Sequence, residues 1–165
     1  MSDQRLWAPW RLDFIRDAKP DGCVFCAKSA LADDESALIV HRGERCFVIL
    51  NAYPYNNGHL MVSPFKHVAS IEQLDEGELL ELMTLVQRGI GALRKVYAPE
   101  GFNIGVNQGA AAGAGIADHL HLHVVPRWGG DTNFMPVIGS TRVLPQALAE
   151  SWRELSPRFA EAAPG

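Results

Sequence analysis

The segment "DHLHLHVVPRW", from Asp118 to Trp128, constrains the fold of this chain most strongly. Histidines occupy three alternate positions, and apolar residues fill the positions between them. Alternate residues of a β-strand lie on one face, so His119, His121 and His123 are expected to point one way and their apolar neighbours into a core. The rise of ~3.3 Å per residue separates neighbouring imidazoles by about 6–7 Å. That spacing spans one substrate group without bringing adjacent rings into hydrogen-bond contact.

Three aligned imidazoles favour chemistry at phosphorus. Mutual repulsion is expected to lower their pKa values and to keep at least one ring neutral near pH 7. A neutral imidazole is a nucleophile, and a protonated neighbour donates to an anion. This division suits transfer of a phosphoryl or nucleotidyl group, in which negative charge grows on the non-bridging oxygens. Two other interpretations stay open: a zinc site on the sheet face, and half-buried polar residues with no further role.

The rest of the chain predicts more strands and one long helix. Apolar, β-branched runs are bounded by turn residues such as those of "NAYPYNNG". The predicted strands span residues 37–42, 45–52, 59–64, 101–108 and 119–125, and the first two form a hairpin. Antiparallel strands joined by short turns, with one long helix, make an α+β fold.

A helix is predicted over residues 76–97. Its apolar residues recur at steps of three and four, which places them in one stripe that covers the sheet. Asp75 and Glu78 form a capping pair, and Pro99 ends the run. A weaker helix is predicted in the tail around "LPQALAESWRELSPRF".

Composition limits the function classes. A chain of 165 residues with 47% hydrophobic and 21% charged residues is expected to be one soluble domain. A formal charge of −4 gives no bulk attraction for polynucleotide or anionic membrane. No apolar run of about 18 residues is present, and the first residues lack the hydrophobic centre of a signal peptide. We therefore expect a cytoplasmic protein with no membrane partner.

The cysteines favour a metal or free thiols over disulfides. There are three, and Cys23 and Cys26 in "CVFC" have the two-residue gap common in zinc sites. Tetrahedral zinc needs two more ligands than this pair supplies. The alternative is that both are reduced thiols packing as small hydrophobes, as Cys46 does in its strand.

Several motifs together resemble the histidine triad (HIT) superfamily of nucleotidyl hydrolases and transferases. "HLHLHVV" matches its triad signature, "NAYPYNNGHLMVSP" looks like its upstream Gly-His segment, and "GFNIGVNQGAAAGAG" resembles the loop before the triad. "WAPWR", "VVPRWGGDTNF" and "IGSTRVLPQ" are similar to the bacterial diadenosine tetraphosphate phosphorylases, on the fragile-histidine-triad side of the superfamily. The resemblance implies a HIT-like α+β fold: an antiparallel sheet, one long covering helix and a C-terminal extension.

The resemblance also implies roles for four histidines. His121 is the expected nucleophile, which forms a nucleotidyl-imidazole intermediate at the α-phosphate. His123 and His59 are expected to contact phosphate oxygens. His119 is expected to orient the neighbouring ring through a hydrogen bond.

Other implied contacts lie in loops. Gln108 corresponds to a glutamine at the bridging phosphate of the hydrolases, and Asn51 to a residue that holds the ribose. The glycine-rich loop with Gly113 and Gly115 is expected to present backbone N–H groups to phosphate as a nest, or else to be a flexible turn. Asn107 matches the phosphorylases, but the serine of the phosphorylase loop is lost, and Gln108 is the residue expected of hydrolases. The acceptor that frees the nucleotide, inorganic phosphate or water, therefore stays open.

By the same resemblance, a structural zinc is expected on Cys23, Cys26, His67 and His119. If zinc binds His119, that ring cannot donate a proton to substrate. Magnesium is expected only in company with the polyphosphate. The partners implied are a small nucleotide and a second copy of the chain, paired through the long helix and the triad-side strand.

The predicted domain is residues 1–165, with extensions over about 1–20 and 127–165. Arg127 is either a phosphate-steering residue or a solvated arginine at a strand end. The expected activity is cleavage of dinucleoside polyphosphates such as diadenosine tetraphosphate. The alternatives are a phosphoramidase acting on AMP–amine conjugates, a nucleotide-binding sensor without turnover, and a metal-binding protein that uses the histidine face.

Overall fold

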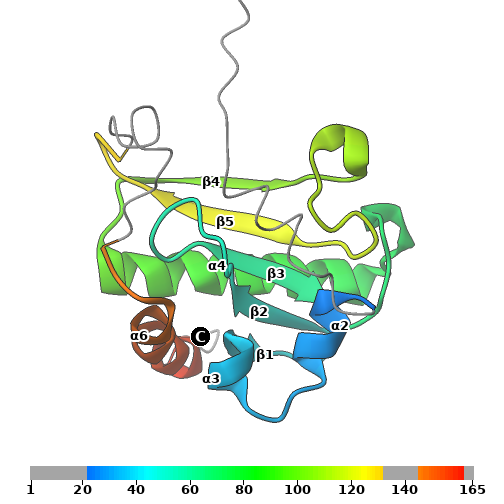
Figure 1. Ribbon diagram of the computed structural model, residues 1–165, viewed down its shortest axis with the longest axis horizontal. Coiled ribbons are helices and arrows are strands. Elements are labelled where there is room, and N and C mark those ends of the chain that lie inside the picture. The colour runs from blue at the N-terminus through cyan, green and yellow to red at the C-terminus, as the bar shows by residue number, and fades with distance from the viewer. Residues whose placement is uncertain (1–21, 132–144, 162–165) are drawn as a thin grey trace, which may run out of the picture.

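The computed structural model describes residues 22–131 and 145–161. Its strands form one antiparallel sheet in the order β1-β2-β3-β5-β4 (Figure 1). They are β1 (Ile39–Arg42), β2 (Cys46–Leu50), β3 (Leu60–Pro64), β4 (Gly101–Val106) and β5 (Leu122–Arg127). Each strand predicted from the sequence is present, and β1 and β2 form the predicted hairpin, so the α+β class is confirmed.

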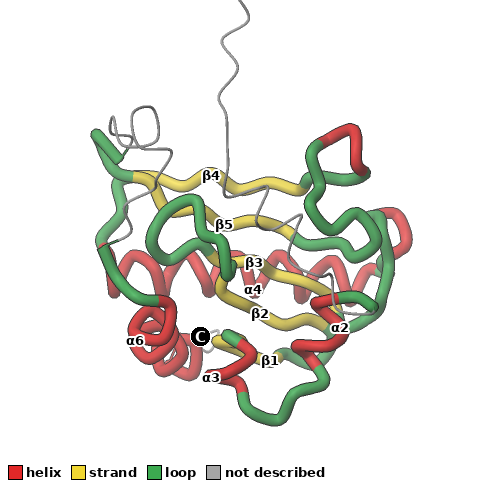
Figure 2. Tube along the Cα trace, viewed as in Figure 1, coloured by secondary structure: helices red, strands yellow, loops and turns green. Residues whose placement is uncertain are grey.

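Helices cover this sheet at several places (Figure 2). They are α2 (Val24–Ser29), α3 (Asp34–Ala37), α4 (Glu76–Tyr97) and α6 (Leu148–Glu161), with short 3-10 turns η1 (Ile71–Gln73) and η2 (Ala110–Ala112). The long helix α4 has the predicted bounds. The predicted capping pair is formed: the Asp75 carboxylate accepts from the Glu78 N–H at 2.8 Å, and the Glu78 carboxylate accepts from the Asp75 N–H at 2.9 Å.

The two faces of the sheet carry separate apolar clusters. One cluster lies between the sheet and α4, and includes Leu60, Val62, Leu122, Val124 and Leu93. The opposite face carries a smaller cluster of Phe25, Ala37, Ile39, Phe47, Ile49 and Met61. Because both faces are covered, all five residues of β2 are buried. His123, the histidine of β5, lies on the face of the smaller cluster, since it pairs with Met61 across the ladder.

The triad strand is shorter than predicted. The ladder begins at Leu122, whereas the sequence pattern placed the start at His119. Before that point Leu120 leaves the ladder, because its N–H donates to the Val68 carbonyl at 2.7 Å. Leu120 still packs into the core cluster, as predicted for the apolar positions.

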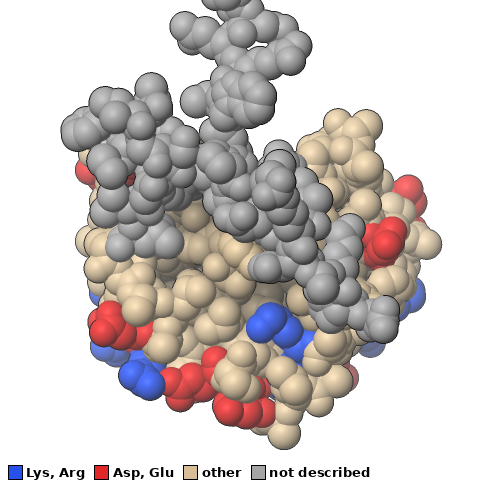
Figure 3. Space-filling model, in the orientation of Figure 1, with Lys and Arg blue, Asp and Glu red and all other residues tan. Residues whose placement is uncertain are grey.

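Charged side chains of both signs lie mixed along the lower rim of the face shown in Figure 3, near α3 and α6. Of the helices described, not one combines the length and the apolarity needed to cross a bilayer. The "WAPWR" motif lies outside the described residues, and so do residues 132–144 and 162–165 of the predicted 127–165 extension.

Candidate active site

His121 is held with one ring nitrogen committed and the other available. Its Nδ1 lies 2.8 Å from the backbone carbonyl of His119, so Nδ1 carries the proton and donates it. Nε2 then keeps its lone pair. The ring packs between Phe25, at 4.9 Å between centroids, and His123, also at 4.9 Å, and only 5% of the residue is exposed. This is the arrangement that a nucleophilic imidazole requires.

His123 receives its orientation from His59. The Tyr55 N–H donates to His59 Nδ1 at 3.1 Å, so the proton of neutral His59 is on Nε2. That Nε2 lies 2.9 Å from His123 Nδ1, which therefore accepts. The remaining proton of neutral His123 is on its Nε2. His123 thus carries an N–H donor in a ring that packs against the nucleophile candidate His121, at 4.9 Å between centroids.

Burial lowers the pKa of all three triad histidines. For His119, His121 and His123 the loss of water around the charged form is the largest cause, and repulsion from neighbouring rings is a smaller cause for His119 and His123. The pKa of His123 falls to about 4. The expected direction is confirmed, but the expected cause, mutual repulsion, is not the main one. His123 is therefore neutral at neutral pH, and it is not the protonated companion expected from the sequence.

His59 and Asn51 lie together at the ends of the loop between β2 and β3. His59 is fully buried. The Asn51 side chain accepts from the Tyr53 N–H at 2.9 Å, and its amide nitrogen lies 3.4 Å from His59 Nδ1. Both residues thus support the loop beside the triad in this conformation.

The loop before the triad is exposed at Asn107, Gln108, Gly113 and Gly115. The Gln108 amide is engaged with η1: its oxygen accepts from the Ile71 N–H at 2.9 Å, and its nitrogen donates to the Glu72 carboxylate at 3.2 Å. A phosphate contact by Gln108 requires both bonds to open. Gly113 has a φ of +85°, a backbone conformation that favours glycine, and its N–H donates to a carbonyl within the loop.

Four further side chains gather at the other end of the histidine row. The metal-binding atoms of Cys23, Cys26, His67 and His119 all lie within 4.8 Å of one another. Cys23 Sγ is 3.2 Å and Cys26 Sγ is 3.6 Å from His119 Nδ1, and Cys26 Sγ is 3.4 Å from His67 Nδ1. The structure thus brings together the four residues that the resemblance implied.

This cluster fits a tetrahedral metal ion. Usual zinc–sulfur and zinc–nitrogen bond lengths separate tetrahedral ligand atoms by roughly 3.5 Å. His119 Nε2 donates to the Pro64 carbonyl at 2.9 Å, so its Nδ1 lone pair faces the two sulfurs. Burial and the neighbouring Cys23 raise the pKa of the Cys26 thiol, and a cation between the sulfurs offsets both effects. Two sulfur and two nitrogen donors form a set that suits zinc.

Comparisons with known proteins identify the family. A family profile described as the HIT domain matches residues 33–130. The AP-4-A phosphorylase of Mycobacterium tuberculosis is 42% identical over 165 aligned residues, which cover 95% of this chain and 85% of that protein. The chain belongs to the HIT family.

Solved structures agree with this assignment. A zinc-bound histidine triad family protein from Mycobacterium smegmatis is 31% identical and superposes with a TM-score of 0.67, covering 85% of this chain and 94% of its own. The diadenosine triphosphate hydrolase of Plasmodium falciparum is 18% identical, with a TM-score of 0.61 and coverages of 78% and 77%, and shares the fold. The HIT-like fold expected from the sequence is therefore confirmed.

Sequence reasoning missed two aromatic residues of this HIT site. Phe25 packs on both His119 and His121, at centroid distances of 5.2 and 4.9 Å, and Tyr55 packs on His59 at 4.8 Å. Both lie inside motifs that were recognised for other reasons, "CVFC" and "NAYPYNNG". For Phe25 the available signal was the run of five apolar residues in β2. Such a run is typical of a strand covered on both faces, and Phe25 packs in the cluster on the second face.

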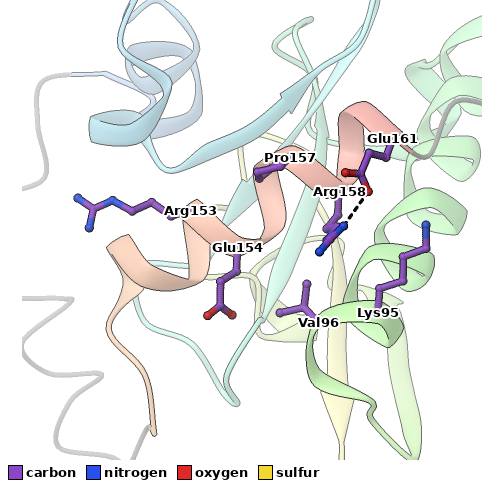
Figure 4. Close-up of a pocket in the computed structure, with 7 residues that line it drawn as sticks. All are labelled: Lys95, Val96, Arg153, Glu154, Pro157, Arg158 and Glu161. Atoms are coloured by element: carbon purple, nitrogen blue, oxygen red, sulfur yellow. Dashed lines mark hydrogen bonds and ion pairs between the residues drawn. The ribbon is translucent and has the colours of Figure 1, made fainter.

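The HIT chain has a second concavity, between α4 and α6. This groove of about 440 Å³ is lined by Lys95, Val96, Arg153, Glu154, Pro157, Arg158 and Glu161 (Figure 4). Arg158 pairs with Glu161 at 2.8 Å, and Arg153 pairs with Glu35 at 2.8 Å. Its mixed and largely paired charges give it no preference for a polyphosphate, so the histidine face remains the candidate site.

Proposed function

We propose that this protein cleaves dinucleoside polyphosphates such as diadenosine tetraphosphate at the α-phosphate, through a nucleotidyl-histidine intermediate. The observation that carries this proposal is the pair of fixed tautomers: His121 keeps a lone pair on Nε2, and the ring of His123, which packs on His121, carries its proton on Nε2. The mycobacterial relative named AP-4-A phosphorylase supports the substrate class.

The reaction runs in two displacements. His121 Nε2 attacks the α-phosphorus, so a P–N bond forms while the P–O bond to the leaving nucleotide breaks and its electron pair stays on the departing oxygen. An oxygen of phosphate or water then attacks the same phosphorus. As the new P–O bond forms, the P–N bond breaks and its electron pair returns to His121 Nε2.

His123 donates to the phosphate oxygens on which negative charge grows, and such a donor contributes a factor of about 10²–10³ in precedents. His59 takes a different role from the direct phosphate contact expected from the sequence. It is fully buried and its Nε2 is bonded to His123, so it acts as a positioning residue. Asn51 supports His59 from behind.

The acceptor is proposed to be inorganic phosphate, which gives ADP and ATP from diadenosine tetraphosphate. The name of the 42% identical relative favours phosphate over water. Asn107 and the backbone at Gly115 lie in the exposed loop before the triad and are the proposed holders of the incoming phosphate, whereas the Gly113 N–H already donates to the Ala110 carbonyl. Gln108, the hydrolase-like residue, is tied to η1.

Product analysis tests the function. The metal-loaded protein is incubated with diadenosine tetraphosphate, with and without inorganic phosphate, beside a His121→Asn control. ADP that forms only with phosphate supports phosphorolysis, and AMP in both tubes supports hydrolysis. No cleavage in either tube contradicts the proposal, and turnover of an AMP–amine conjugate instead favours the phosphoramidase.

A structural zinc on Cys23, Cys26, His67 and His119 is part of the proposal. Bound there, zinc supplies structure and no reaction step, because it ties α2 to the segment after β3 and to the start of the triad. The three free thiols are in keeping with the reducing conditions of the cytoplasm, the proposed location. Magnesium is proposed only as a companion of the polyphosphate, since no second metal-ligand group occurs among the described residues.

A homodimer is proposed through α4 and the edge strand β4. Apolar side chains are exposed there, and the most exposed are Leu80 at 71%, Met83 at 51% and Ile104 at 46%. β4 ends the sheet, so its outer edge is unpaired within the described chain. Light scattering during size-exclusion chromatography tests this, and a Leu80→Glu/Met83→Glu variant is expected to elute as a monomer.

A further inference from the structure

Asn56, in the loop between β2 and β3, is hydrogen-bonded to residues outside that loop. The Asn56 amide donates to the Asp131 carboxylate at 2.7 Å and to the Pro126 carbonyl at 3.0 Å. The backbone carbonyl of Asn56 accepts from the N–H of His59 at 3.2 Å. One residue therefore links the end of β5 to the histidine that orients His123.

Asp131 is a rigid anchor for this link. Arg127 donates two hydrogen bonds to the Asp131 carboxylate, from Nε to Oδ2 at 2.5 Å and from Nη2 to Oδ1 at 2.8 Å. A third bond, from Arg127 Nη1 to the Asn103 side chain at 2.6 Å, fixes the guanidinium to β4. Planar, two-point pairs of this kind are strong and geometrically specific. The Asp131 side chain is 9% exposed, and that of Arg127 is 43% exposed.

The anchor ties the Arg127 side chain to two neighbours. Its side chain is 43% exposed at the end of β5, and the hydrogen bonds that it makes to described residues go to Asp131 and Asn103. The Arg127 hydrogen bonds hold the pKa of the Asp131 carboxyl well below its usual range. Asp131 is therefore a permanent acceptor for the Asn56 amide.

We infer that Asp131 is a positioning residue of the active site, which acts on His123 through Asn56 and His59. With Asn56 held, the Tyr55 N–H stays on His59 Nδ1, and His59 Nε2 donates to His123. Without the anchor, His59 is free to turn or to change tautomer, and the donor of His123 is no longer directed at the phosphate. The catalytic part of this inference rests on the proposed function, whereas the state of the histidine rings does not.

The experiment compares Asp131→Ala and Asn56→Ala with Asp34→Ala in the full metal-loaded protein. Asp34 is a matched control, because it accepts from Arg42 Nε at 2.8 Å in an ion pair built on α3 and β1. Two kinds of measurement are made. Steady-state kinetics give kcat and KM for diadenosine tetraphosphate, and NMR gives the ring-nitrogen signals of His59 and His123 in the free protein.

Both test variants are expected to lower kcat on the order of 10²-fold with little change in KM, since the donor is misplaced and not removed. Their His59 and His123 signals are expected to shift, and the double variant is expected to lose no more than either single one. Asp34→Ala is expected to change neither quantity.

Unchanged ring signals and kcat in folded Asn56→Ala overturn the inference. Should Asp131→Ala fail to fold, Asn56→Ala carries the test, because it leaves the Arg127–Asp131 pair intact. If the protein proves inactive on dinucleoside polyphosphates, the ring signals still decide the positioning role, so the two failures are distinguishable.

Discussion

The two ends of the histidine row are the same residue type, but they have opposite surroundings. His119 meets two sulfurs and a second imidazole, and its Nε2 is tied to the Pro64 carbonyl. His123 meets His59, which leaves the proton of the neutral His123 ring on Nε2. The difference teaches that the partner of one ring nitrogen decides what the other nitrogen does.

The middle histidine is tied to the metal end of the row and contacts the His123 end. His121 donates to the carbonyl of His119 and packs its ring on His123. A disturbance at either end is therefore expected to reach it. The predictions below separate a metal end that stabilises the fold from a phosphate end that carries the chemistry.

Loss of the nucleophile is expected to have the largest effect. His121→Asn removes the Nε2 lone pair, so turnover of diadenosine tetraphosphate should fall on the order of 10⁴-fold or more. Zinc content and melting temperature should stay close to those of the native protein. A variant that keeps substantial turnover, or loses its metal, contradicts the division between the two ends.

Breaking the metal end is expected to affect stability most. Cys26→Ser removes a ligand, and we expect loss of zinc and a melting temperature lower by about 10 °C, because metal binding contributes directly to folding. Metal analysis and thermal unfolding with and without added zinc measure this. Cys46→Ala is the control, since Cys46 lies buried in β2, outside the cluster. Equal effects of both variants would show that the cluster holds no stabilising metal.

Substitution of His59 tests the His123 end of the row. His59→Ala should lower kcat by about 10²-fold without releasing zinc, because the orientation of His123 is lost. His59→Gln should retain more activity than His59→Ala, since a glutamine amide can donate to His123 Nδ1 from a position near that of the lost Nε2. Steady-state kinetics and metal analysis give the answer. If the glutamine variant is no better than the alanine variant, donation to His123 is not what His59 supplies.

The smallest expected effect is a pH dependence of stability. Burial lowers the native pKa of His123 to about 4, while an unfolded histidine titrates near 6.5, so the unfolded state binds more protons between these values. The free energy of unfolding should therefore fall as the pH drops from about 6.5 toward 4, by up to about 1.4 kcal/mol per pH unit from this residue. Urea unfolding of native protein and His123→Gln at several pH values measures the difference. Parallel curves for the two proteins argue against a neutral, buried His123.

Local patterns predicted much of this molecule. The alternation of His119 to Val124 gave the correct core positions, and the steps of three and four residues gave the bounds of α4. Spacing in "CVFC" and the family resemblance named the four residues that meet in the metal cluster. These signals succeed because each depends on neighbours in the sequence or on a motif with fixed geometry.

The failures involve contacts between distant segments. The role of His59 depends on its bond to His123. The engagement of Gln108 depends on η1, and the late start of β5 depends on the Val68 carbonyl. Lowered pKa values were foreseen, but their main cause, burial, follows only from the tertiary structure. No local pattern encodes which groups from 30 or more positions away supply these contacts, so the sequence alone could not reveal them.

The position of Phe25 has a practical consequence for enzymology. Phe25 lies in α2 between Cys23 and Cys26, and its ring packs on the imidazole of His121, so anything that reshapes α2 also reaches the attacking group. Purification in strong chelators or after air oxidation should therefore yield batches of lower specific activity with an unaltered KM. Titrating back zinc under reducing conditions should bring such batches to one common rate.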